Sequence, residues 1–77
     1  MTREEKKREE QWRAQARPTT EGYYPIRGVR LEIHGRPWVL ELHEWGWHAE
    51  HFGFRTRSYS TAERAIAAVE ALIWEEG

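Results

Sequence analysis

Histidines and glutamates in the middle of the chain are the side chains best suited to chemistry. His43 and His48 are expected on one face of an antiparallel sheet with Glu41 and Glu50, whereas His51 falls on the other face. Two imidazoles and a carboxylate are a known ligand set for zinc and related ions. His43 and His48 are therefore candidate metal ligands, with either glutamate as the third.

Other residues argue against metal binding and against catalysis. Arg55 and Arg57 are expected beside the two histidines, and their positive charge repels a cation. Glu41 and Glu50 would lie on an open sheet face, where water is not excluded and neither acid is desolvated. The chain has no Cys, no Asp and no phosphate-binding loop. We therefore expect no metal, no cofactor and no enzymatic activity, and we interpret the two histidines as exposed sheet residues.

Five tryptophans among 77 residues exceed what one small core requires. Trp38 and Trp47 are expected in the core and Trp74 at its edge, which leaves two tryptophans without a structural role. Because tryptophan is enriched at the energetic centres of interfaces, this excess indicates partner binding. The candidate partner-binding residues are Trp12, Trp45, Phe52, Arg55 and Arg57.

The composition narrows the class of protein. A chain of 77 residues forms one domain at most, and without cysteine it has no disulfide framework. A net charge of −1 argues against a general nucleic-acid binder. We expect a cytoplasmic protein that does not enter membranes, because no apolar run approaches about 18 residues and the N-terminus has no signal-peptide pattern. The composition leaves the oligomeric state open.

The chain is predicted to consist of a charged helical arm over residues 1–17, a linker over 18–27 and a compact domain over 28–77. Thr2 followed by Glu5 has the spacing of a helix capping box. Proline, glycine and threonine are typical of the linker.

The arm has little apolar surface of its own. Its ion pairs, Glu4 with Arg8 and Glu9 with Arg13, have the helical i,i+4 spacing, and Trp12 is its only large apolar residue. Three outcomes are open: a solvated arm, an arm that orders on a partner, or an arm that folds over the open face of the sheet.

Alternating apolar residues predict an antiparallel meander of four strands, or of three if Gly53 marks a bulge in a long third strand. A loop at 34–37 would pair Leu31 with Leu40, and a turn at 45–46 would pair His43 with His48. A third turn at Phe52–Gly53 would join the last two strands.

The C-terminal segment predicts an amphipathic helix over residues 61–75. Ser60 is expected to cap it, with Glu63 closing a capping box. Its apolar stripe should cover the apolar face of the sheet, which gives an α+β fold.

Residues 28–73 resemble small bacterial and phage-borne domains that combine a Trp strand, a Gly turn, an Arg/Ser strand and a T-x-E-x-A-I helix. The resemblance implies a sheet-plus-helix fold and no particular activity. The chain is also similar in type to small phage-encoded inhibitors such as anti-CRISPR proteins. The matching positions are Trp47, Gly53, Arg55, Arg57, Tyr59, Thr61, Glu63, Ala65 and Ile66.

These observations favour a non-enzymatic protein-binding module that modulates or inhibits a bacterial macromolecular complex. The alternative is a nucleic-acid-binding accessory protein, in which arginines and aromatic residues on the open sheet face contact a single strand.

Overall fold

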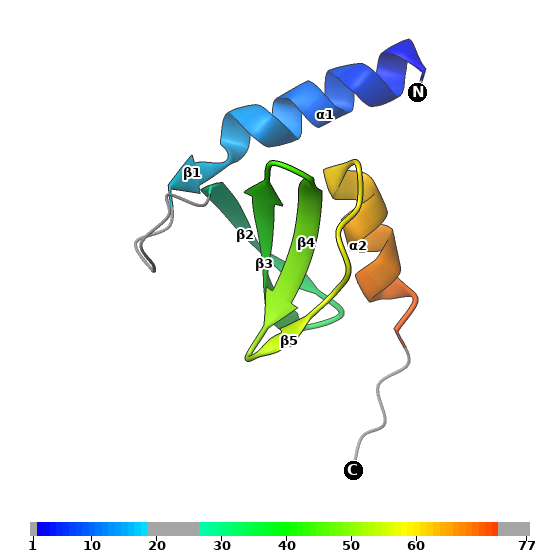
Figure 1. Cartoon of the computed structure of the whole chain (residues 1–77). Coiled ribbons are helices and arrows are strands. Elements are labelled where there is room, and N and C mark those ends of the chain that lie inside the picture. The colour runs from blue at the N-terminus through cyan, green and yellow to red at the C-terminus, as the bar shows by residue number, and fades with distance from the viewer. Residues whose placement is uncertain (1, 19–26, 73–77) are drawn as a thin grey trace.

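The alternating segments form an antiparallel sheet and both helical segments form helices, so the predicted α+β class is confirmed (Figure 1). The computed structural model describes residues 2–18 and 27–72. Within these residues the sheet has five strands, one more than predicted, in the order in which they follow along the chain. The elements are α1 (Arg3–Gln15), β1 (Arg17–Pro18), β2 (Arg27–Ile33), β3 (Arg36–His43), β4 (Gly46–His51), β5 (Phe54–Arg55) and α2 (Ala62–Glu70).

The core lies between the sheet and α2. Trp38 and Trp47 are both buried there, as predicted. The alternation of β3 and β4 places their apolar side chains on one face, and the apolar stripe of α2 covers that face. The buried apolar residues are Ala16, Ile33, Trp38, Leu40, Trp47, Ala49, Ala62, Ala65 and Val69.

The pairing register of the first two hairpins differs from the prediction by two residues. Leu31 pairs with Trp38 rather than with Leu40, because the first turn consists of His34 and Gly35 alone. These two residues have φ values of 52° and 73°, which suit a two-residue hairpin turn.

The second turn consists of Glu44 and Trp45, so His43 pairs with Gly46 and not with His48. The predicted pairings were wrong in both hairpins, but a shift of two keeps every side chain on its predicted face. The third turn, Phe52–Gly53, is confirmed.

Threonines cap both helices. Thr2 accepts a hydrogen bond from the Glu5 amide, as predicted. Thr61, rather than Ser60, caps α2 by accepting from the Arg64 amide, because the helix begins one residue later than expected. Helix α2 ends at Glu70, and the predicted continuation to residue 75, with Trp74, lies outside the described residues.

Helix α1 packs against the rest of the fold, across one end of the sheet and beside the start of α2 (Figure 1). Glu9 is buried, and Trp12 and Ala16 contact the core. Arg17 and Pro18 then pair with β2 as the short edge strand β1. The predicted arm is therefore joined to the domain, while residues 19–26 of the predicted linker lie outside the described part of the chain.

Candidate functional site

Two imidazoles and a carboxylate converge on the face of the sheet opposite α2. Glu41 on β3 pairs directly with His48 on β4, and His43 lies two residues beyond Glu41 on the same face. His43 Nε2 is 3.5 Å from His48 Nε2, which is 3.6 Å from Glu41 Oε1. One ligand atom from each of the three residues lies within 4.8 Å of the others. The corrected register thus brings together the residues that the sequence marked as candidate ligands.

Aromatic stacking orders this cluster. The rings of His43 and His48 stack with centroids 4.3 Å apart, and the indole of Trp45 stacks on His43 at 5.7 Å with an interplanar angle of 2°. Trp45 is 71% exposed, because it occupies the β3–β4 turn. The indole thus covers the more exposed of the two histidines and fixes its plane.

Burial favours the neutral form of both histidines. His48 is only 3% exposed, so its interpretation as an exposed residue was wrong. Burial, followed by the charges of His43 and Arg55, lowers the pKa of His48 to about 4. Burial and Arg55 also lower the pKa of His43. Both imidazoles are therefore neutral at pH 7, the form in which histidine binds metals.

A second group of aromatic residues lies at the β4–β5 turn. Phe52 is 88% exposed and Phe54 is 45% exposed. The His51 ring stacks on buried Trp38 at 5.0 Å and meets Phe52 edge-on at 4.7 Å. His51 Nδ1 lies 2.6 Å from the Pro37 carbonyl, to which it donates a hydrogen bond. The apolar rings of this turn are therefore exposed, and the residues beside them are held in place by Trp38 and by the Pro37 carbonyl.

The predicted contact residues do not form one patch. Trp45 and Phe52 occupy turns at opposite ends of β4, about 20 Å apart by the rise of a strand (Figure 1). Trp12 is half-buried and packs against the core. Arg55 Nη2 lies 3.8 Å from Glu50 Oε2, and Arg57 is exposed on the segment after β5.

The sequence missed Glu9, which binds several elements together. Its carboxylate accepts hydrogen bonds from the Trp47 indole at 2.8 Å and from the Ala62 amide at 3.0 Å. A signal existed, because Glu9 shares a helical stripe with Trp12 and Ala16, at i, i+3 and i+7. Because Glu9 is charged, this stripe is not recognised when only apolar residues are counted.

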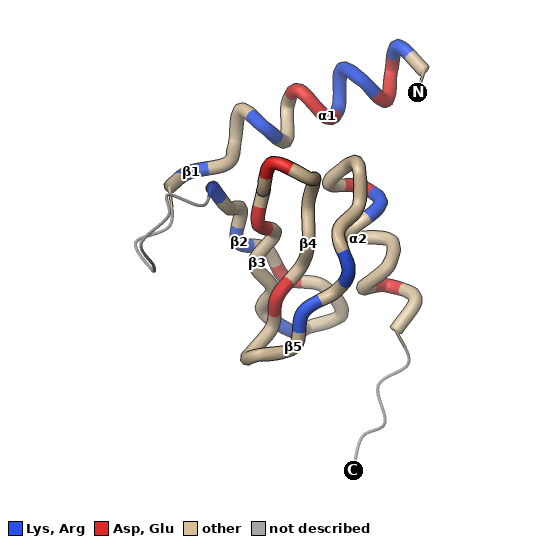
Figure 2. Tube along the Cα trace, in the orientation of Figure 1, with Lys and Arg blue, Asp and Glu red and all other residues tan. Residues whose placement is uncertain are grey.

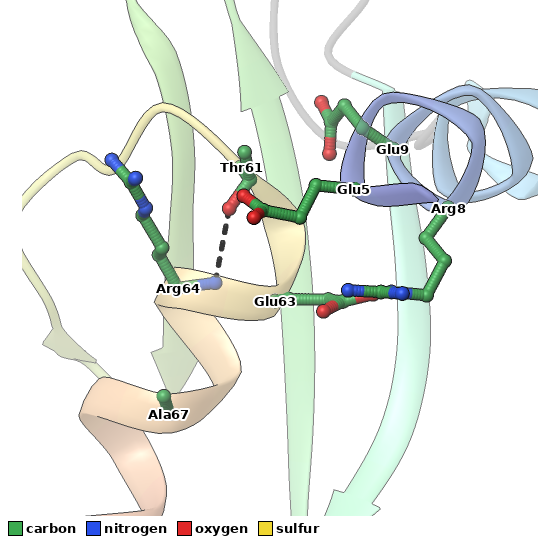
Figure 3. A pocket seen from close by; sticks show the side chains of 7 residues that line it. All are labelled: Glu5, Arg8, Glu9, Thr61, Glu63, Arg64 and Ala67. Carbon is green, nitrogen blue, oxygen red and sulfur yellow. Dashed lines mark hydrogen bonds and ion pairs between the residues drawn. The ribbon is translucent and has the colours of Figure 1, made fainter. Parts of the chain in front are cut away.

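A shallow pocket of about 210 Å³ follows the seam between α1 and α2. Arg8 reaches across it from α1 to Glu63 on α2, at 2.5 Å between Nε and Oε1 (Figure 3). The Arg8–Glu63 ion pair and the hydrogen bond from the Ala62 amide to Glu9 both cross this seam, so the pocket lies within the contact that docks α1 on α2. The lining residues are Glu5, Arg8, Glu9, Thr61, Glu63, Arg64 and Ala67.

Charges of both signs are mixed over the fold. Basic and acidic residues intersperse along α1, and both occur on the strands (Figure 2).

Comparisons of the chain with models of protein families, with curated proteins and with solved structures found no match. Neither α1 nor α2 combines the length and the apolar character needed to cross a membrane.

Proposed function

We propose that this protein is a non-enzymatic binding module that contacts a partner protein through the β4–β5 turn. Phe52 is the observation that carries the proposal. Its ring is 88% exposed and its backbone has φ of 44°, in the left-handed region. A two-residue turn with positive φ at both positions favours Asn or Gly, and another residue there costs about 1 kcal/mol. Phe52 thus has an unfavourable backbone conformation and an apolar ring that is left in water. Residues that are unfavourable for stability in this way concentrate at functional sites.

The surroundings of Phe52 suit an interface. Phe54 lies opposite His51 in the same hairpin, and its ring meets Trp38 edge-on at 6.0 Å. Arg55 follows directly, and aromatic residues with arginine are the side chains most enriched in interface cores. Trp45 offers a second, separate contact at the other end of β4.

The partner that we propose is a bacterial macromolecular complex, inhibited when this turn occupies an apolar recess on its surface. The likeness in type to small phage-encoded inhibitors, anti-CRISPR proteins among them, agrees with this mode of action. A protein partner is favoured over a nucleic acid because the charge of Arg55 is offset by Glu50 and because neither sign predominates (Figure 2).

The substitution Phe52→Asn tests the proposal. Asparagine accepts positive φ, so we expect Tm to rise by about 4–8 °C while capture of the partner is lost. The measurement is an affinity capture from bacterial lysate with wild-type and variant protein, quantified by mass spectrometry, alongside thermal unfolding.

His34→Asn is the matched control, because His34 occupies the equivalent position of the first turn with φ of 52°. It should leave capture unchanged, and Trp45→Ala measures the second contact in the same assay. If Phe52→Asn and the wild type capture equal amounts of the partner, the proposal is wrong. Retention on single-stranded oligonucleotides that weakens steeply with salt would favour the nucleic-acid alternative.

A further inference from the structure

The distances between the ligand atoms of Glu41, His43 and His48 are close to the distances between two ligand atoms bound to one metal ion. A tetrahedral zinc ion with bonds of about 2.0–2.1 Å holds its ligand atoms about 3.3 Å apart. The two Nε2 atoms are 3.5 Å apart, and His48 Nε2 is 3.6 Å from the Glu41 carboxylate. Because the His43 and His48 rings are stacked, they must turn so that both Nε2 lone pairs point at one ion. The three ligand atoms already lie within 4.8 Å of one another.

Hydrogen bonding explains this convergence poorly. A neutral imidazole carries one N–H, so at most one Nε2 can donate to the other, and 3.5 Å is long for such a bond. The contact of 3.6 Å between His48 and Glu41 is longer still. The separations among these three ligand atoms are longer than hydrogen bonds and close to those between ligands of one bound cation.

We propose that Glu41, His43 and His48 bind a divalent transition-metal ion, with zinc as the ion that this ligand set fits best. Two imidazole nitrogens and one carboxylate oxygen are donors that zinc accepts in three-residue sites, where a water molecule takes the fourth position. The ion would join β3 to β4 beside the Trp45 turn, far from the β4–β5 turn.

The scaffold is rigid enough for such a site. All three ligands lie on paired strands, and His48 is held in the buried part of β4. The Trp45 indole restrains the plane of His43. Arg55 is the cation that opposes metal binding, but Glu50 lies 3.8 Å from its guanidinium and offsets part of its charge.

Titration of tag-free, chelator-treated protein with zinc sulfate tests the site. Isothermal calorimetry should show saturable binding of one ion per chain, and Tm should rise by about 10–20 °C at a hundredfold excess over Kd. Cobalt titration should give the intense visible absorption of four-coordinate Co²⁺.

Two variants locate the ion without touching buried His48. His43→Gln and Glu41→Gln should each weaken zinc binding by about tenfold or more. His34→Gln and Glu32→Gln change an exposed histidine and an exposed glutamate outside the cluster, and both should bind zinc as wild type does. Absence of binding heat and of a Tm shift would overturn the proposal. Undiminished binding by His43→Gln would overturn it as well, because the ion would then lie elsewhere.

Discussion

At the scale of the residue, the carboxylate of Glu9 links three parts of the fold through hydrogen bonds. Glu9 is 7% exposed, and its oxygens accept from the Trp47 indole, from the Ala62 amide and from Arg13 Nε at 2.7 Å. A buried carboxylate is tolerated when donors surround it, and the charged ones are the strongest. The amino end of α2 adds a favourable dipole. Glu9 thereby adds buried hydrogen bonds to the apolar contacts that Trp12 and Ala16 make with the core.

We expect Glu9→Ala to lower the free energy of unfolding by about 2–4 kcal/mol. The loss arises because the buried N–H groups of Trp47 and Ala62 would have no acceptor from α1. Glu10→Ala is the matched control, since Glu10 is exposed on the same helix and should change stability by less than about 0.5 kcal/mol. Urea unfolding monitored by tryptophan fluorescence measures both, and equal effects would contradict this role of Glu9.

At the scale of the element, sequence periodicity predicted which face each side chain occupies but not which residues pair. Alternation has a period of two, so a register moved by two residues satisfies it equally well. The true register depends on the turns, and in the first of them His34 adopts positive φ. A residue other than Gly, Asn or Asp gives little warning of that conformation. The sequence grouped Glu41, His43 and His48 on one face because that grouping required only the right face and not the right pairing.

Gly46 lies where the segment between β5 and α2 contacts β4. Trp47 exchanges two backbone hydrogen bonds of 2.7 Å with Tyr59, which brings that chain close to the neighbouring glycine. A Cβ on Gly46 would lie 2.2 Å from the Tyr59 carbonyl oxygen, whereas one on Gly35 would meet nothing within 4 Å.

We therefore expect Gly46→Ala to cost about 3–5 kcal/mol, from steric overlap added to the strain of its φ of 121°. Gly35→Ala has only backbone strain and should cost about 1–2 kcal/mol. Thermal unfolding by circular dichroism compares the two. A difference within error would show that the segment moves aside freely.

At the scale of the whole molecule, two features occupy opposite ends of one strand. The β4–β5 turn presents exposed phenylalanines, and the polar cluster lies toward the Trp45 turn. The sequence predicted Trp45 and Phe52 as contact residues but did not show that they lie at opposite ends of β4, because distance along a strand is hidden when only faces are assigned. The exposure of Phe54 was not predicted. Docking of α1 could not be predicted from apolar patterning either, because the contact depends on Glu9.

The stability of the metal-free protein should depend on pH through His48. Its folded pKa is about 4 against an ordinary value of 6.5, so the unfolded chain binds more protons between these values. The free energy of unfolding should therefore fall as pH decreases from about 6.5 to 4. Burial is the main cause, His43 and Arg55 act in the same direction, and Glu50 opposes them.

Urea unfolding in the presence of a chelator, between pH 7.5 and 4.5, measures this dependence. His34→Gln is the control variant, since it removes an exposed turn histidine outside the cluster. A flat profile between pH 7 and 5 would show that His48 is protonated in the folded protein as readily as in the unfolded chain.

The bond between Glu9 and Ala62 spans 53 residues, and it constrains how the protein can fold during synthesis. Each strand pairs with its neighbour in the chain, so the hairpins can form one after another as they leave the ribosome. Helix α1 precedes the strands and α2 in the chain, yet its buried carboxylate reaches the Ala62 amide only after α2 has begun to form. Helix α1 is thus translated before these elements but becomes fixed only after them.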